Sequence, residues 1–211
     1  MDYKIKKNSG ATRRTAGFTL IETLFAVLIL GLTIVGPLSI AAKGLHLARI
    51  SKDQTTAYYM AQDAVEYIHF ARDTNCLVSG SSGTGCSPVN WLVGNGNPTQ
   101  TINLIPCISP DGSISCYLDS LSQNPTSPSL CVGVCPVLYY DPINKNYTYA
   151  TVSGLVPTIF TRTITIQSPR GANDCIGTDG CEALLTVKIT WKDAGGRGHN
   201  VVVYENIFNW E

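Results

Sequence analysis

The strongest hydrophobic pattern in the chain is an apolar run near its N-terminus. Residues 20–42 are almost wholly apolar, with Glu22 as the only ionisable residue among them. About 20 such residues suffice to cross a bilayer as a helix. Beyond the run, small and apolar residues recur at spacings of four and three, on one face of an amphipathic helix: Ala57, Ala61, Ala64, Ile68 and Ala71. The pattern predicts one helix from Phe18 to about Asp73, whose first half spans a membrane.

Pro37 interrupts the apolar half of this helix. It has no N–H to donate to the Thr33 carbonyl, and its ring crowds that carbonyl. A kink or a locally opened turn is therefore expected at this position.

The last third of the chain changes to a period of two. β-branched and aromatic residues predict strands at residues 147–152, 158–167, 183–192 and 200–208. A glycine-rich stretch at residues 193–199 predicts a hairpin between the last two. We therefore expect an antiparallel sheet of about four strands under the outer half of the helix, an α+β arrangement.

Between helix and sheet, residues 74–135 are rich in Gly, Ser, Asn, Pro and Cys and show little periodicity. We expect an irregular region held by disulfides, with Trp91-Leu92 and Val137-Leu138 as buried anchors. The expected organisation is a basic leader (1–17), the membrane half of the helix (18–42), its outer half (43–73), the Cys-rich region (74–135) and the sheet head (136–211).

Eight cysteines all lie after residue 75: Cys76, Cys86, Cys107, Cys116, Cys131, Cys135, Cys175 and Cys181. An even number on one side of a membrane anchor indicates disulfides formed in an oxidising compartment. A metal site is the alternative, but zinc ligands usually come in tighter pairs with nearby histidines. The pairing stays open; the short loops Cys131–Cys135 and Cys175–Cys181 are the first candidates for local bridges.

The formal net charge of zero conceals an uneven layout. The first 17 residues carry a net charge of +4, and the rest carries −4. The mildly acidic body gives no support for binding nucleic acid through phosphate contacts. The basic leader instead predicts that the N-terminus stays in the cytoplasm and the cysteine-rich body lies outside.

Gly17 is a small residue that precedes the apolar run and resembles a processing point. An ordinary signal peptide is cleaved after its apolar core, and no such site follows the run here. A plain signal anchor would explain the basic flank and the span, but not Glu22, since a carboxylate in an apolar helix needs a partner. Cleavage after Gly17 would free the Phe18 amine. We hypothesise that Glu22 of a neighbouring subunit neutralises this amine and fixes the register between helices.

The string from Gly17 through Phe18 to Glu22, with its basic leader and apolar helix, resembles the class III signal of type IV pilins and pseudopilins. The resemblance implies cleavage after Gly17 by prepilin peptidase, methylation of Phe18, and an assembly role for Phe18 and Glu22. It also implies the long-helix-on-sheet fold, a helix break at Pro37, and partners that include other pilin or pseudopilin subunits, an inner-membrane assembly platform and membrane lipid. The closing hairpin resembles that of minor pilins of the pilus-modification type or of small secretion pseudopilins.

No pattern in the chain indicates an enzyme. His46, His69 and His199 are isolated, and no nucleophile elbow, zinc-binding H-E-x-x-H, phosphate-binding loop or redox pair is present. No cofactor and no metal is expected. Three hypotheses remain: a minor subunit of a type IV pilus or type II secretion filament, a surface binding module (adhesin or DNA-uptake pilin) that uses the cysteine-stapled loops, and a membrane-anchored extracytoplasmic enzyme. The precursor is expected in the cytoplasmic membrane, and the mature subunit in a surface filament.

Overall fold

The computed structural model describes residues 17–79, 91–97, 100–120, 127–168 and 182–209 of the 211. Two compact units divide the chain, residues 1–49 and residues 50–211. The helix α1, Leu20–Ser79, contributes to both of them.

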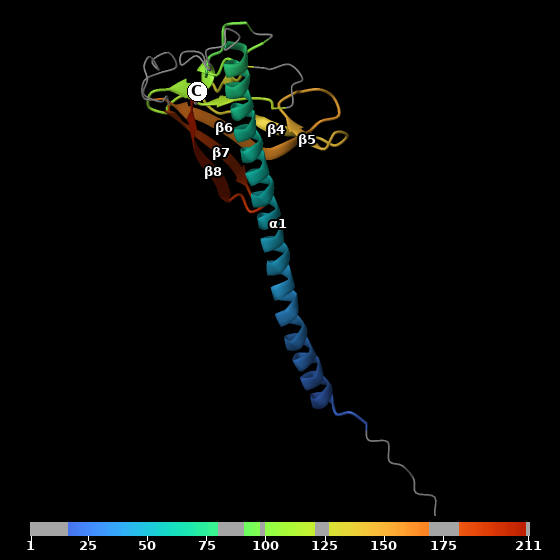
Figure 1. The fold of residues 1–211 in the computed structure, drawn as a ribbon. Helices are drawn as coiled ribbons and strands as arrows, with labels where there is room; N and C mark the ends of the chain where they lie inside the picture. The colour runs from blue at the N-terminus through green and yellow to red at the C-terminus, as the bar shows by residue number, and fades with distance from the viewer. Residues whose placement is uncertain (1–16, 80–90, 98–99, 121–126, 169–181, 210–211) are drawn as a thin grey trace, which may run out of the picture. The chain divides into compact units, whose positions relative to one another are not determined.

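The outer half of α1 buries the face that the sequence predicted. Its alanines and Ile68 have no exposed surface: Ala57, Ala61, Ala64, Ile68 and Ala71. Figure 1 shows this half lying along one face of β6, β7 and β8. Small side chains permit close packing between helix and sheet. The helix extends to Ser79, beyond the predicted end near Asp73. In its last turns the buried Asn75 side chain bonds to the backbones of Trp91 and Ile102.

The predicted antiparallel sheet is present but has eight strands rather than about four. Its centre consists of β6 (Val156–Gln167), β7 (Glu182–Lys192) and β8 (Gly198–Phe208), close to the ranges predicted for the last three strands. Residues of β6 and β8 pair with β7 in an unbroken antiparallel register. The glycine-rich hairpin joins β7 to β8, as expected.

The remaining strands are short and attach mostly to β6. They are β1 (Ile108–Ser109), β2 (Cys116–Tyr117), β3 (Ser129–Leu130), β4 (Val137–Asp141) and β5 (Asn146–Thr148). The first three lie in the stretch predicted to be irregular, and β5 is shorter than predicted. β6 pairs with β1, β2, β4 and β7, so it is the central strand of the whole sheet.

Alternation along β6 decides which side chains enter the core. Phe160, Arg162, Ile164 and Ile166 are buried against the helix side, and the residues that alternate with them, 161, 163 and 165, are part-exposed. The predicted anchors Trp91 and Leu92 are also buried, as is Leu138, whereas Val137 is 38% exposed.

Arg162 occupies an inward position of β6 and is only 1% exposed. Its guanidinium donates to the Asp63 carboxylate at 2.8 Å, to the Met60 carbonyl at 3.1 Å and to the Leu118 carbonyl at 2.8 Å. The ring of Tyr149 lies 5.7 Å from its carbon Cζ. One side chain thereby joins the helix, the central strand and the segment after β2.

Two disulfides staple the region before β4. Cys107 is bonded to Cys116, which fixes the loop between β1 and β2. Cys131 is bonded to Cys135, which confirms that predicted bridge. Cys76 is also in a disulfide. The other cysteines, Cys86, Cys175 and Cys181, lie outside the described residues, and so does the predicted Cys175–Cys181 bridge.

Candidate functional site

The candidate site is the N-terminal end of α1, where a threonine caps the helix. The Glu22 N–H donates to the Thr19 carbonyl at 3.0 Å, and it lies 3.4 Å from the Thr19 hydroxyl oxygen Oγ1. The Thr23 N–H donates to the same carbonyl at 3.2 Å. Thr19-Leu20-Ile21-Glu22 has the T-x-x-E spacing of a capping box. Our reading of the sequence missed this role of Thr19, although the spacing is visible in it.

The cap places Glu22 in the first turn of α1. A carboxylate is favoured there because the unsatisfied N–H groups give the helix start a partial positive charge. The same charge disfavours an ammonium group at Phe18. Glu22 is exposed and has no ion-pair partner among the residues that the structure describes. Phe18 is exposed as well. The single chain therefore leaves both groups of the hypothesised pair available to another subunit.

Gly17 is not required by packing within the described part of the chain. A Cβ atom built there would meet nothing within 4 Å, and its φ is outside the left-handed region. Neither close contact nor backbone conformation explains the glycine. Recognition by another protein, such as a peptidase that needs a small residue at this position, would explain the glycine.

The surface that follows the site is apolar and exposed along the first unit. Large side chains from Leu20 to Leu47 are all more than half exposed. Hydroxyl groups within this surface are satisfied by the helix itself, since each donates to the carbonyl three residues earlier at 2.8 Å: Thr23, Thr33 and Ser39. Within the described residues one helix, α1, is long and apolar enough to cross a membrane. Such a surface suits lipid or other apolar helices.

Pro37 lies inside α1, and the helix continues on both sides of it. The Thr33 carbonyl has lost its usual helical donor there, because proline carries no N–H. The helix break predicted at Pro37 stays a prediction.

The three histidines do not form a catalytic group. His69 pairs with Glu205 at 2.8 Å, between α1 and β8. His199 lies 3.2 Å from Asp193 and stacks on Trp191 in the β7–β8 hairpin. His46 lies on α1 within the first compact unit, beyond the apolar run 20–42. In the described ranges no three His, Cys, Asp or Glu residues come together as metal ligands.

The hairpin tip is organised by the carboxylate of Asp193. It accepts the N–H groups of Gly195 at 2.8 Å and Arg197 at 2.9 Å, and it also contacts the side chains of Arg197 and His199. The Arg197 backbone N–H is the main reason that the pKa of Asp193 is held well below its usual value. These contacts hold the β7–β8 turn in its conformation, which is a structural role for Asp193.

Comparison with known families bears on the N-terminal site. Residues 12–36 match the family described as the prokaryotic N-terminal methylation motif. This motif is the prepilin-type signal of type IV pilins, so the resemblance read from Gly17, Phe18 and Glu22 is confirmed at the level of the signal. The match spans the signal and part of the apolar helix, not the head. No curated protein and no solved structure matches the chain.

The motif and the apolar helix together support a type IV pilin-like subunit, in which an N-terminal hydrophobic helix carries a globular head. They fit a membrane-anchored precursor that later enters an extracytoplasmic filament. The motif favours a structural subunit over an enzyme.

Proposed function

We propose that the chain is a minor pilin or pseudopilin, cleaved between Gly17 and Phe18 by prepilin peptidase and methylated on Phe18. It then assembles through its apolar helix into a type IV pilus or a type II secretion-like filament. The observation that carries the proposal is the capped start of α1, where a lone exposed carboxylate, Glu22, stands four residues from the new N-terminus at the head of an exposed apolar surface.

The assembly step follows from electrostatics. After cleavage, the ammonium group of Phe18 lies beside the positive end of its own helix, which is unfavourable. In its own chain, Glu22 has the spacing to reach back to the Thr19 N–H of the capping box. A neighbouring Glu22 supplies the missing negative charge. In apolar surroundings the pair strengthens, because a low dielectric raises the interaction between opposite charges. This sets the axial register between subunits.

One feature supports a minor rather than a major subunit. The described residues between α1 and β4 form only a three-residue helix and two-residue strands, with two disulfides, and repetitive packing of a major subunit favours a more compact head. We therefore propose that few copies enter each filament, in contact with other pilin subunits, the inner-membrane assembly platform and lipid.

Exposed valines on the Cys131–Cys135 loop, Val132 and Val134, favour the second candidate, a surface binding module that recognises a target through its stapled loops.

The decisive experiment compares Glu22→Gln with Glu66→Gln in the native cell. Both changes remove one exposed carboxylate from α1, but Glu66 lies in the outer half and contacts Gln62 within the helix. We expect Glu22→Gln to insert in the membrane normally and to disappear from sheared filament fractions, and Glu66→Gln to assemble. Normal assembly of Glu22→Gln would show that the charge pair is wrong.

Mass spectrometry of the mature N-terminus tests the processing step separately. A methylated Phe18 is expected. A chain that still begins at Met1 would indicate a plain signal anchor and exclude pilin processing, whatever the Glu22 variant does.

A further inference from the structure

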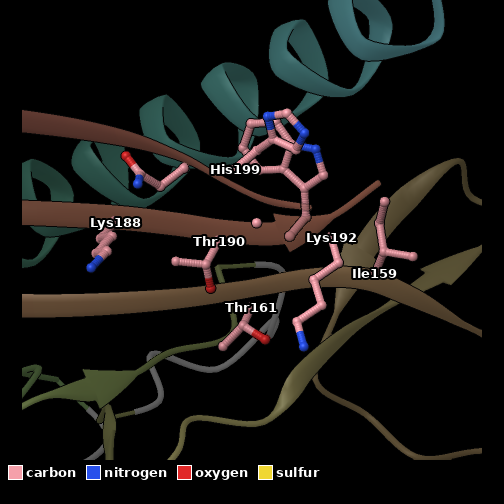
Figure 2. A pocket seen from close by; sticks show the side chains of 9 residues that line it. Ile159, Thr161, Lys188, Thr190, Lys192 and His199 are labelled. Carbon is pink, nitrogen blue, oxygen red and sulfur yellow. The ribbon is translucent and has the colours of Figure 1, made fainter. Parts of the chain in front are cut away.

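A hollow beside the β7–β8 hairpin is lined by lysine, threonine and asparagine side chains together with Ile159, Trp191 and His199. Burial alternates along β6 and β7, so that Arg162 and Ile189 point toward α1 and their neighbours point the other way. The hollow has a volume of about 630 Å³. Figure 2 shows Lys188 and Lys192 on either side of Thr190, with Thr161 beside them.

Strand register explains why these side chains gather. Thr190 of β7 is paired with Thr161 of β6 on one side and with Asn200 of β8 on the other. The three residues form a polar row across the sheet. Lys188 and Lys192 lie two residues before and after Thr190, so all of them share one face. With about 3.4 Å per residue, the two lysine backbones are roughly 14 Å apart along β7.

The polar groups of this row have no partner of their own. In the part of the chain that the structure describes, Lys188 and Lys192 form no ion pair, and the side chains of Thr161, Thr190 and Asn200 form no hydrogen bond. Some other threonines of the sheet have hydrogen-bond partners. Thr158, for example, donates to the Leu138 carbonyl at 2.7 Å. The row therefore keeps unused donors and acceptors for a molecule from solution.

The hollow is also positively charged in a chain whose net charge is zero. The carboxylate of Asp193, which follows Lys192 in the sequence, is engaged by Arg197 and His199, and its side chain is only 4% exposed. Glu205 pairs with His69 on α1. Among the described residues that line the hollow there is no carboxylate, so an anion that enters it meets two ammonium groups.

We propose that this hollow binds an acidic polysaccharide, with Lys188 and Lys192 contacting successive carboxylate groups and the Thr161–Thr190–Asn200 row contacting sugar hydroxyls. An extended polymer matches the spacing of the lysines along one strand. Tyr204, which is paired with Thr186 on the same face and is 67% exposed, provides an amphipathic ring for an adjoining sugar.

Nucleic acid fits this face less well than a polysaccharide. Backbone recognition of nucleic acid needs a cluster of basic residues together with aromatic side chains on which bases stack. Aromatic rings are present at this face, but only two of the residues that line the hollow are lysines, and the body of the chain is acidic. The proposal concerns the head alone and does not depend on the filament role.

The test is a titration of the full chain in detergent with polygalacturonate, neutral dextran and an oligothymidylate of similar length. We expect binding to polygalacturonate that weakens with salt, and little binding to dextran. The double variant Lys188→Gln/Lys192→Gln should bind roughly 25-fold more weakly, at about fivefold for each lost charge contact. Lys145→Gln, in the exposed β4–β5 turn, is the matched control and should bind as the wild type does.

A second variant separates binding from folding. A Cβ atom at Gly198 meets nothing within 4 Å, and Gly198 lies opposite Lys192. Gly198→Glu should therefore fold normally, with an unchanged thermal midpoint, and still weaken polygalacturonate binding by placing a carboxylate in the hollow. Three results would each overturn the proposal. Dextran could bind as tightly as polygalacturonate, Lys145→Gln could lose as much polygalacturonate affinity as the double lysine variant, or the oligothymidylate could bind more tightly than polygalacturonate.

Discussion

Replacing Arg162 by methionine tests whether one buried guanidinium holds the head together. Methionine keeps much of the apolar stem but removes three charge-assisted hydrogen bonds, and it leaves the carbonyls of Met60 and Leu118 without these donors. Breaking a buried ion pair by removing one partner costs about 3–5 kcal/mol. The Asp63 side chain is 47% exposed and can return to water, so we expect the lower end of that range, about 3 kcal/mol.

The matched control is Arg197→Met, the same chemical change in an ion pair whose cation is exposed and whose carboxylate keeps its backbone N–H donors. The Arg197 side chain is 65% exposed, and exposed pairs contribute about 0–1 kcal/mol. Denaturant unfolding of the full chain in detergent, followed through the fluorescence of the buried Trp91 and Trp191, measures both variants.

For a head of this size, about 3 kcal/mol corresponds to a thermal midpoint lowered by roughly 6–12 °C. The reasoning is refuted if Arg162→Met and Arg197→Met unfold at the same denaturant concentration, or if Arg162→Met changes only the slope of the transition.

Two further predictions concern other polar anchors of the head. Asn75→Leu removes the fully buried amide that bonds the Trp91 and Ile102 backbones. We expect a loss of about 2–3 kcal/mol and faster hydrogen exchange around Ile102, and unchanged exchange there would contradict the anchor. Folding lowers the pKa of Asp193. The Asp193 carboxylate therefore contributes fully to the stability of the fold above its unfolded pKa of about 3.9, and this contribution is lost as pH falls toward the folded pKa. The gap in thermal midpoint between wild type and Asp193→Asn should therefore be constant at neutral pH and shrink below about pH 4; a gap that stays constant down to pH 2 would disprove it.

The elements that the sequence predicted well are those with long, regular periods. The alanine face of α1 and the alternation of β6, β7 and β8 each extend over several repeats, so that side-chain burial follows directly from spacing. The two-residue strands β1, β2 and β3 contain no period at all, and their pairing with β6 or with one another depends on contacts between segments distant in sequence. Leu138 is buried as predicted, but Val137 is 38% exposed, and the sequence pattern did not predict that the two begin β4.

Arg162 shows where sequence reasoning stopped short. It stands in phase with Ile164 and Ile166, so the alternation itself assigns it to the buried face. Its main partner, Asp63, lies 99 residues earlier on α1, and no local pattern specifies such a pair. The N-terminal site is the opposite case. Its motif is local and complete in the sequence, but its proposed partner belongs to another chain.

The position of β6 has a consequence for the order in which the head matures. Strands β1, β2 and β4 precede β6 in the chain and cannot complete their pairing until residues 156–167 have been synthesised. The bridges Cys107–Cys116 and Cys131–Cys135 span separations of only nine and four residues. Oxidation can therefore close both loops on the nascent segment first, and β6 then docks onto strands whose ends are already tethered.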